Sequence, residues 1–313
     1  MSKGRPYHVY GVRLASAWPL PYPSIPTPFL ADISLGHGSA ADFKGALNDI
    51  SLPPQNGTPW LTTALPDGSR YLRWSGVFEF LIVKDGRSVL CRPLASGGVK
   101  AFHTHLGPSL SFALINLGIE PLHSTTLVID GAAVALMGDC GYGKSSLGAS
   151  FVRAGHQLLT DDLLVTAHDD GGFMAYAGAP RVKLYPAIAR RIFGSGVRGL
   201  RLRPLTPKLI IPLDGTRARR TPAPLRAIYM LTPPGARRAA RVVIKALSPR
   251  RAFLELVRNT FNMAVEEPSR LERQFALASQ LAMSVPVKSL SYPREFGMLS
   301  AAREAILADL RSS

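Results

Sequence analysis

Alternating strand and helix signals mark the middle of the chain. Two short apolar runs are separated by Gly131 and predict two neighbouring strands. A helical stretch follows, and Gly155 is suited to end it because glycine readily adopts the left-handed conformation of a helix C-cap. Further apolar runs predict more strands, so this part is predicted to form an α/β sheet. The predicted strands are TTLVID (125–130), AAVALM (132–137), the run HQLLTDDLLVTA (156–167), which is β-rich and interrupted by an acidic pair, and FMAYAG (173–178), and the predicted helix is 144–154.

The carboxyl-terminal part has mostly helical periodicity. Ser248 and Pro249 are suited to the N-cap and first turn of a helix over RRAFLELVRNTF. A second helix is predicted over 268–283, and VPVKSLSY (285–292) predicts a strand. The closing helix is predicted over 294–310, with Phe296, Leu299, Ile306 and Leu310 on its inward face.

The amino-terminal part is predicted to be a separate, β-rich accessory region. Its first sixty residues are rich in Pro, Gly and Ser and show little periodicity. Beyond them, FEFLIV and SVLCRP predict a β-hairpin in which Asp85 and Gly86 supply the positive φ angles of a tight turn. GPSLSFALINLG predicts a helix that ends at Gly118. The predicted organisation is an accessory region over 1–120 and a second domain over 121–313.

Composition narrows the class of protein. Of the 313 residues, 46% are hydrophobic and 8% aromatic, which is typical of a globular chain rather than a disordered one. No apolar run approaches the ~20 residues of a membrane span, and the first residues lack the apolar segment of a secretory signal. Cys91 and Cys140 form neither a metal-binding pattern nor a disulfide framework. A soluble cytoplasmic protein with no membrane partner is the simplest interpretation.

The formal charge of +16 is concentrated in one segment. Residues 181–251 contain 18 Lys and Arg and one acid, Asp214, whereas the rest of the chain has 19 basic and 20 acidic residues. Such a segment either forms a solvated surface or attracts an acidic partner. Nucleic acid is not the expected partner, because aromatic residues for base stacking are scarce there and no nucleic-acid-binding motif occurs.

The segment GDCGYGKS matches the pattern G-x-x-x-x-G-K-[ST] of a phosphate-binding loop (P-loop) at every defined position. Its glycines let successive N–H groups point inward at an anion, and the following helix adds its positive dipole end. Lys144 is predicted to reach the β- and γ-phosphates of ATP, and the hydroxyl of Ser145 to hold Mg²⁺. Cys140 is predicted to be a small residue at a variable position, with a reactive thiol as the alternative. The predicted nucleotide-binding residues are Gly138, Asp139, Cys140, Gly141, Tyr142, Gly143, Lys144, Ser145 and Ser146.

An acidic pair, Asp161 and Asp162, follows the predicted helix. The pair is predicted to lie at the end of a strand, close to the phosphate loop. Because adjacent strand residues point to opposite faces, the two are predicted to have different roles. One would hold Mg²⁺ and the other would accept a proton from an attacking hydroxyl. A turn or helix-capping aspartate is the alternative.

The residues from His123 to Asp162 resemble the catalytic core of HPr kinase/phosphorylase and the HPr kinase-like proteins. In that family a histidine precedes the loop by the interval that separates His123 from Gly138. The family loop reads G-D-S-G-x-G-K-S, and an R-G-H-R-L-x-A-D-D string follows the helix. This chain has RAGHQLLTDD there, with one residue inserted. A looser resemblance to the HPr kinase-like proteins of lasso-peptide clusters extends over PRVKLYPAIARRIFG (180–194) and VPVKSLSYP (285–293).

The resemblance implies a fold like that of phosphoenolpyruvate carboxykinase, with a P-loop kinase core of the HPr kinase type. It implies that Asp161 is the catalytic base and that Asp162 and Ser145 are metal-site residues. It also implies that His123 lies at the phosphate site and takes part in catalysis with Lys144. From the residues alone, His123 would be interpreted as a buried core histidine.

The chain departs from the family pattern in two ways. Cys140 stands where serine is usual, and the signature L-E-x-R-G of bacterial HPr kinases, with its metal-binding glutamate, does not occur. Arg181 and Lys183 occupy that region, so neither reverse phosphorylase activity nor HPr as substrate is implied. These two residues are predicted either to clamp a phosphate or an acidic acceptor, or to be surface bases. His103 and His105 would face one way on a strand, but no further ligand lies nearby and no metal site is expected there.

These observations predict a Mg²⁺- and ATP-dependent serine kinase that phosphorylates a peptide or small protein. The narrower prediction is a kinase for a lasso-peptide precursor with a C-terminal serine, drawn in by its acidic residues or its free carboxylate. A nucleotide-gated binding module and a kinase for a small metabolite are the alternatives. The acidic pair favours an enzyme, because nucleotide binding alone requires no base. The sequence leaves open the acceptor, the preference between ATP and GTP, and whether the chain forms a homo-oligomer.

Overall fold

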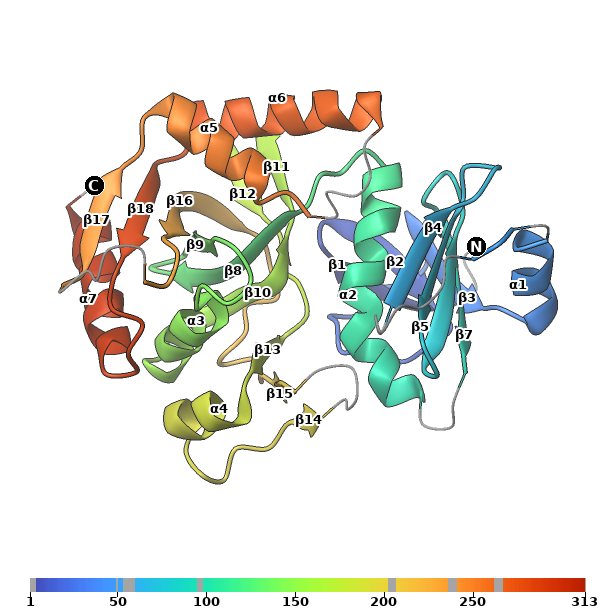
Figure 1. Cartoon of the computed structure of the whole chain (residues 1–313), viewed down its shortest axis with the longest axis horizontal. Helices are drawn as coiled ribbons and strands as arrows, with labels where there is room; N and C mark the ends of the chain where they lie inside the picture. Colours follow the sequence, from blue (N-terminus) through green and yellow to red (C-terminus); the bar gives the residue numbers. More distant parts are fainter. Residues whose placement is uncertain are drawn as a thin grey trace. The chain divides into compact units, whose positions relative to one another are not determined.

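The computed structural model describes residues 4–48, 50–52, 60–94, 98–201, 207–235, 241–261 and 267–312, with the side chains of 98–105 left out. The described residues divide into two compact units, one up to Ile119 and one from Glu120 onward (Figure 1). In the part of the chain that is described, no helix is long and apolar enough to cross a membrane.

The first unit is a mixed sheet with two helices. Its described strands follow the order β1-β2-β3-β7-β6-β5-β4. The pairs β2–β3 and β3–β7 are parallel and the others antiparallel. Helix α2 packs against β6 and β7. The elements are β1 (Arg5–Val9), β2 (Val12–Ser16), β3 (Ile33–His37), α1 (Ala40–Ala46), β4 (Trp60–Ala64), β5 (Arg70–Trp74), β6 (Phe78–Ile82), β7 (Ser88–Pro93) and α2 (Gly98–Asn116).

The predicted hairpin of this unit is confirmed as the antiparallel pair β6–β7. Its turn differs in one detail, because Gly86 adopts a positive φ of 72° and Asp85 does not. The helix ending at Gly118 is also confirmed, with a φ of 81° at that glycine. Strands β1, β2 and β3 and helix α1 were not predicted, because the first sixty residues show little periodicity. Helix α1 has a capping box between Ser39 and Asp42. Residues 103 and 105 lie in α2 rather than on a strand, and their side chains are outside the described residues.

The second unit is built on a mixed sheet. Its described strands follow the order β10-β8-β9-β16-β12-β11, and β18 pairs with both β16 and β17. The strand β16 is parallel to β9 and β18, while β8 is antiparallel to both β9 and β10. The strands are β8 (Leu122–Ile129), β9 (Ala132–Met137), β10 (Gln157–Leu164), β11 (Thr166–Asp169), β12 (Gly172–Ala175), β16 (Ala223–Leu231), β17 (Val243–Ala246) and β18 (Val287–Ser291).

A small sheet and five helices complete the second unit as described. The small sheet has the order β13-β15-β14 and is antiparallel. The strands and helices predicted for this unit are found, but the run 156–167 forms β10 and the start of β11 with no break at the acidic pair, and the central strand β16 was not predicted. The closing helix begins at Met298, so Phe296 precedes it. The elements are α3 (Lys144–Arg153), β13 (Arg181–Leu184), α4 (Pro186–Phe193), β14 (Leu200–Arg201), β15 (Leu209–Pro212), α5 (Pro249–Arg258), α6 (Pro268–Ser284) and α7 (Met298–Arg311).

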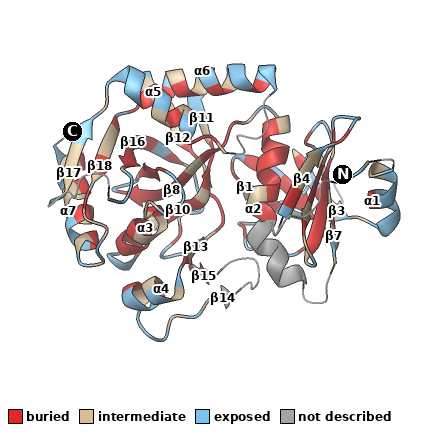
Figure 2. Cartoon of the chain, viewed as in Figure 1, coloured by how far each residue is buried: buried red, intermediate tan, exposed pale blue. Residues whose placement is uncertain are grey.

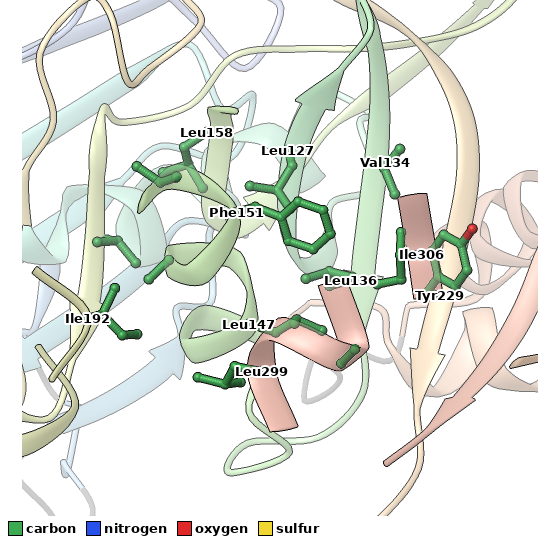
Figure 3. Close-up of a cluster of buried hydrophobic side chains, with 14 of the residues drawn as sticks. Leu127, Val134, Leu136, Leu147, Phe151, Leu158, Ile192, Tyr229, Leu299 and Ile306 are labelled. Carbon is green, nitrogen blue, oxygen red and sulfur yellow. The ribbon is translucent and has the colours of Figure 1, made fainter. Parts of the chain in front are cut away.

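Both faces of the central sheet are covered, which explains the continuous apolar runs of the sequence. Alternate residues of β9 enter different clusters: Val134 and Leu136 pack with α3 and α7, whereas Met137 packs with α5 and α6. Figure 3 shows the first cluster, with Leu147 and Phe151 of α3 near Leu136. The central strands are buried along most of their length (Figure 2). A strand buried on both faces loses the apolar–polar alternation of a half-exposed strand.

Glycine determines how closely α3 approaches the sheet. A Cβ atom added at Gly148 would come within 2.5 Å of Cγ2 of Thr125 on β8. Thr125 also hydrogen-bonds to Asp161 on the neighbouring strand. The absence of a side chain at Gly148 therefore lets the helix that begins at the glycine-rich loop lie directly against the strands that carry the acidic pair.

A buried ion pair joins the start of the second unit to α6. Nε of Arg270 donates to Glu120 at 3.0 Å, and the two side chains are 0% and 2% exposed. Nε of Arg273 donates to the other carboxylate oxygen at 3.1 Å.

We expect Glu120→Gln to lower the free energy of unfolding by about 3 kcal/mol, because it leaves a buried guanidinium without a counter-charge. The matched control is Glu304→Gln, whose pair with Arg303 is 58% exposed on the glutamate side and should be worth less than about 1 kcal/mol. Urea unfolding of both variants measures the difference, and equal losses would refute this interpretation.

Candidate functional site

The glycine-rich loop connects the end of β9 to the start of α3. Gly138, Gly141 and Gly143 have φ angles of 132°, 88° and 92°, a region that residues with a Cβ rarely adopt. Gly143 is the N-cap residue of α3. A Cβ atom at Gly138 would also lie 3.0 Å from the carbonyl oxygen of Leu231. The loop conformation therefore depends on glycine at these positions, as the sequence motif predicts.

Lys144 is folded into this loop. Its Nζ donates to the carbonyl oxygens of Gly138 at 2.5 Å and Asp139 at 3.1 Å. Burial lowers the pKa of Lys144, although the nearby carboxylate of Asp161 opposes that shift. The ammonium thus occupies the interior of the loop and holds its first two carbonyl groups together.

Asn259, the C-cap residue of α5, supports the loop from outside. Its Oδ1 accepts from the N–H of Gly138 at 2.9 Å, and its Nδ2 donates to the carbonyl of Glu255 at 2.8 Å. Its backbone carbonyl accepts from the N–H of His123 at 2.7 Å. No sequence pattern pointed to Asn259, which lies 121 positions from Gly138.

The acidic pair lies inside β10, not at the end of a strand as predicted. Asp161 and Asp162 pair with Thr125 and Ser124 of β8. The predicted alternation is also wrong, because both aspartates line the same cavity. Asp162 has a φ of +81°, which is uncommon for a residue other than glycine and costs backbone energy. This turn of the backbone breaks the two-residue period of the strand and allows neighbouring carboxylates to share one face.

Asp161 is held by three donors. Its Oδ1 accepts from the hydroxyls of Thr125 at 2.6 Å and Ser145 at 3.1 Å, and its Oδ2 accepts from the backbone N–H of Lys183 at 3.0 Å. Burial raises the pKa of Asp161, and the neighbouring charge of Asp162 raises it further. Its carboxylate therefore binds protons more strongly than an exposed one while staying fixed against the loop serine.

Asp162 forms an ion pair with the ammonium of Lys183 on β13. Burial acts to raise the pKa of Asp162, but the charge of Lys183 outweighs it, and Arg181 and His123 add to the same effect. The pKa of Asp162 is therefore lowered, and this carboxylate stays negatively charged. Its side chain is 28% exposed, so an incoming cation or hydroxyl can reach it.

The aspartate cavity, named here for this pair, has a volume of about 170 Å³. Burial, and then the charge of Lys144, lowers the pKa of His123 to about 4, so its imidazole is neutral near pH 7. Lys208 and Tyr185 also line the cavity, and no local pattern in the sequence pointed to either. The lining has three lysines and two carboxylates, and this excess of positive charge favours the binding of an anion. The lining residues are His123, Cys140, Gly141, Gly143, Lys144, Ser145, Ser146, Asp161, Asp162, Lys183, Leu184, Tyr185 and Lys208.

The remaining predicted site residues are distributed around this cavity. Gly138, Asp139 and Tyr142 line a neighbouring hollow of about 450 Å³ beside α5, called the α5 cavity below. Arg181 is buried and is not among the described residues that line the aspartate cavity, whereas Lys183 lines it. The alternative that both are surface bases is therefore wrong.

The oxygen donors of the site suit a hard divalent cation such as Mg²⁺. Ser145 supplies a hydroxyl, and the two aspartates supply carboxylate oxygens. Mg²⁺ is commonly held in proteins by one or two such groups, with water and phosphate oxygens completing the octahedron. Within the described residues, no group of three or more His, Cys, Asp or Glu is placed to hold a metal ion. The protein donors here would thus form part of a shell shared with a phosphate ligand.

Comparison with known proteins gives a structural likeness only. No family model matches the chain, and no curated protein matches it. Among solved structures, the HPr(Ser) kinase/phosphatase from Coxiella burnetii is similar at a TM-score of 0.32 and 12% sequence identity, over 60% of this chain and 97% of that one. The described residues form a mixed α/β structure by their own elements, and the resemblance to that enzyme is distant.

Proposed function

We propose that this chain is a Mg²⁺- and ATP-dependent kinase that transfers the γ-phosphoryl group to a serine hydroxyl of a peptide or small protein. The observation that carries the proposal is one cavity that contains Lys144 and Ser145 of the glycine-rich loop together with both aspartates. A phosphoryl-transfer site needs phosphate-binding groups, metal-binding oxygens and a base within a few ångströms of each other. The residues that line this cavity include groups of all three kinds.

The loop and helix would bind the phosphates of the nucleotide. Backbone N–H groups of a glycine-rich loop form an anion nest, and the amino end of α3 adds its dipole. On nucleotide binding, Nζ of Lys144 would move from the carbonyl oxygens of Gly138 and Asp139 to oxygens of the β- and γ-phosphates. Two hydrogen bonds to neutral acceptors would then be replaced by stronger bonds to charged phosphate oxygens. A bound Mg²⁺ would neutralise charge between the phosphates, with Ser145 and Asp162 as its protein ligands.

Asp161 would act as the general base. In the transfer, the serine oxygen bonds to the γ-phosphorus, the bond from that phosphorus to the β–γ bridging oxygen breaks, and ADP leaves. The hydroxyl proton passes to Asp161, whose raised pKa suits a proton acceptor. Asp162 stays charged and already faces a cation, Lys183, which suits a metal ligand. The hydrogen bond from Ser145 to Asp161 supports the opposite assignment, in which Asp161 is the metal ligand and Asp162 is the base. Substitution of each aspartate in turn distinguishes the two assignments.

The raised pKa of Asp161 favours an enzyme over a nucleotide-gated binding module. A module that only binds nucleotide gains nothing from burying a carboxylate that attracts protons, because the burial costs stability. A kinase would use such a carboxylate to accept the proton of the attacking hydroxyl. A peptide acceptor is favoured over a small metabolite by the basic segment 181–251, which extends well beyond the cavity in sequence.

Lys183 would bind the acceptor. Its side chain is only 16% exposed and lines the cavity from β13. A peptide with acidic residues, or with a C-terminal serine and a free carboxylate as in the proposed lasso-peptide precursor, would place an anion near this lysine. Transfer of the ammonium from Asp162 to that anion would free Asp162 for the metal at the moment the acceptor binds.

Steady-state kinetics on a peptide with a C-terminal serine tests the proposal. We expect Mg²⁺-dependent formation of phosphoserine from ATP, and slower turnover of the same peptide with an amidated C-terminus. Lys183→Ala should raise the acceptor KM about tenfold through loss of one charge-assisted contact, and rising salt should weaken acceptor binding more than ATP binding.

The control is Lys245→Ala, an exposed lysine of the same basic segment on β17, which should leave the acceptor KM unchanged. Arg181→Ala is a poor test because that residue is buried, and its loss would also destabilise the protein. Equal turnover of acid and amide peptides, insensitive to salt and to Lys183→Ala, would refute carboxylate recognition. No ATP-dependent phosphoserine at all would refute the kinase.

A further inference from the structure

A third hollow touches the glycine-rich loop and shares no lining residue with the α5 cavity among the described residues. This arginine–aromatic cavity, as we name it, has a volume of about 310 Å³ and is formed by α4, the loop and the segment after β18. Apart from Gly141, Gly143 and Ser146, none of its lining residues was predicted to bind nucleotide. Its lining residues are Gly141, Gly143, Ser146, Ile188, Arg191, Tyr292, Arg294, Glu295, Phe296 and Leu299.

Two arginine–aromatic pairs give this cavity flat, preformed walls. The guanidinium of Arg191 lies over the ring of Phe296, 4.3 Å from its centroid, and that of Arg294 lies 3.9 Å over the ring of Tyr292. Arg294 is also fixed by hydrogen bonds to the carbonyls of Tyr292 at 3.0 Å and Thr232 at 2.6 Å. Planar cations and rings held in place can stack on a planar ligand with little loss of conformational freedom.

The arginine–aromatic cavity borders the aspartate cavity. Gly141, Gly143 and Ser146 line both of them. The α5 cavity, although larger, has no lining residue in common with the aspartate cavity among the described residues. Of these two hollows, the arginine–aromatic cavity is therefore the one beside the aspartate cavity, and a ligand whose phosphates occupy the aspartate cavity would enter it past Ser146.

We propose that the arginine–aromatic cavity is the nucleoside subsite, which takes the base and ribose of a purine nucleoside triphosphate. The inference rests on the proposed function, since it requires phosphates in the aspartate cavity. The base would stack on the outer face of the Arg191 guanidinium, whose other face lies on the ring of Phe296, because every base has a π-face and stacking on a guanidinium needs no exact hydrogen-bond match. A purine is favoured because its two fused rings cover more of these walls than a pyrimidine does.

Binding measurements with two probes, ATP and inorganic tripolyphosphate, each with Mg²⁺, test the subsite. We expect Arg191→Ala and Phe296→Leu each to raise the Kd for ATP about three- to thirtyfold, as loss of one stacking partner does. The Kd for tripolyphosphate, which has no base, should stay within about twofold of wild type, since the loop and helix that bind phosphate are unchanged. Phe296→Leu removes the ring but keeps the apolar volume, so the fold is retained.

Two matched variants control the experiment. Arg190→Ala removes the exposed neighbour of Arg191 on the same helix, outside the cavity lining, and should leave both affinities unchanged. Leu254→Ala alters the α5 cavity and should do the same. The subsite assignment is overturned if wild-type protein binds both probes but Arg191→Ala and Phe296→Leu leave ATP unaffected, or if Leu254→Ala weakens ATP instead. Wild-type protein that binds neither probe would overturn the proposed function as well.

Discussion

Lys144→Ala is expected to abolish detectable phosphoryl transfer, with a loss of about 10³-fold or more, since it removes the mobile cation that would stabilise charge on the transferred group. It should also weaken binding of Mg·ATP, so that ATP no longer raises the Tm of the variant as it does for wild-type protein. Single-turnover assays and thermal unfolding with and without ATP measure the two effects.

The contacts of Lys144 make this experiment interpretable. Without a ligand its ammonium bonds to two loop carbonyls, so the alanine variant loses those bonds but also avoids burying a charge. These effects oppose each other, and the stability of the ligand-free protein should change by less than about 2 kcal/mol. Lys245→Ala is the control for a lysine without a role at the site. Full activity in Lys144→Ala would mean that the glycine-rich loop has no part in phosphoryl transfer.

Substitution of the acidic pair should separate chemistry from metal binding. Asp161→Asn is expected to bind Mg·ATP normally and to lose roughly 10²–10⁴-fold in kcat, the usual effect of removing a positioned base. Asp162→Asn is expected mainly to raise the Mg²⁺ concentration needed for activity, because a charged metal ligand becomes neutral. Initial rates at a series of Mg²⁺ concentrations, with ATP binding measured separately, distinguish the two.

The opposite pattern is equally informative. If Asp161→Asn raised the Mg²⁺ requirement while Asp162→Asn lost kcat, the hydrogen bond between Asp161 and Ser145 would identify Asp161 as the metal-side carboxylate. If both variants lost only nucleotide affinity, neither would be a base and the binding module would be the better description. Asp161→Asn also keeps an oxygen acceptor for the hydroxyl of Thr125, so a loss of rate would not simply reflect unfolding.

Local sequence predicted the glycine-rich loop and the elements next to it, but not the central strand β16. Apolar runs, the helical repeat of α3 and glycines at positive φ are properties of residues near each other in the chain, so periodicity and backbone preference reveal them. The candidate residues of the loop and the acidic pair were found in this way. Their arrangement was partly mispredicted, because the regular alternation of a strand does not hold at Asp162, whose φ is +81°.

Only the tertiary structure decided which side chains meet. Lys183 reaches Asp162, and Asn259 reaches Gly138, from positions 21 and 121 residues away. The walls of the arginine–aromatic cavity come from α4 and the segment after β18, which local patterns treat as unrelated. Such contacts depend on the order and register of strands across the sheet and on how closely α3 packs at Gly148. These are set by burial of the whole core rather than by any short stretch of residues, which is why the sequence alone indicated the glycine-rich loop and the acidic pair but not the other residues around them.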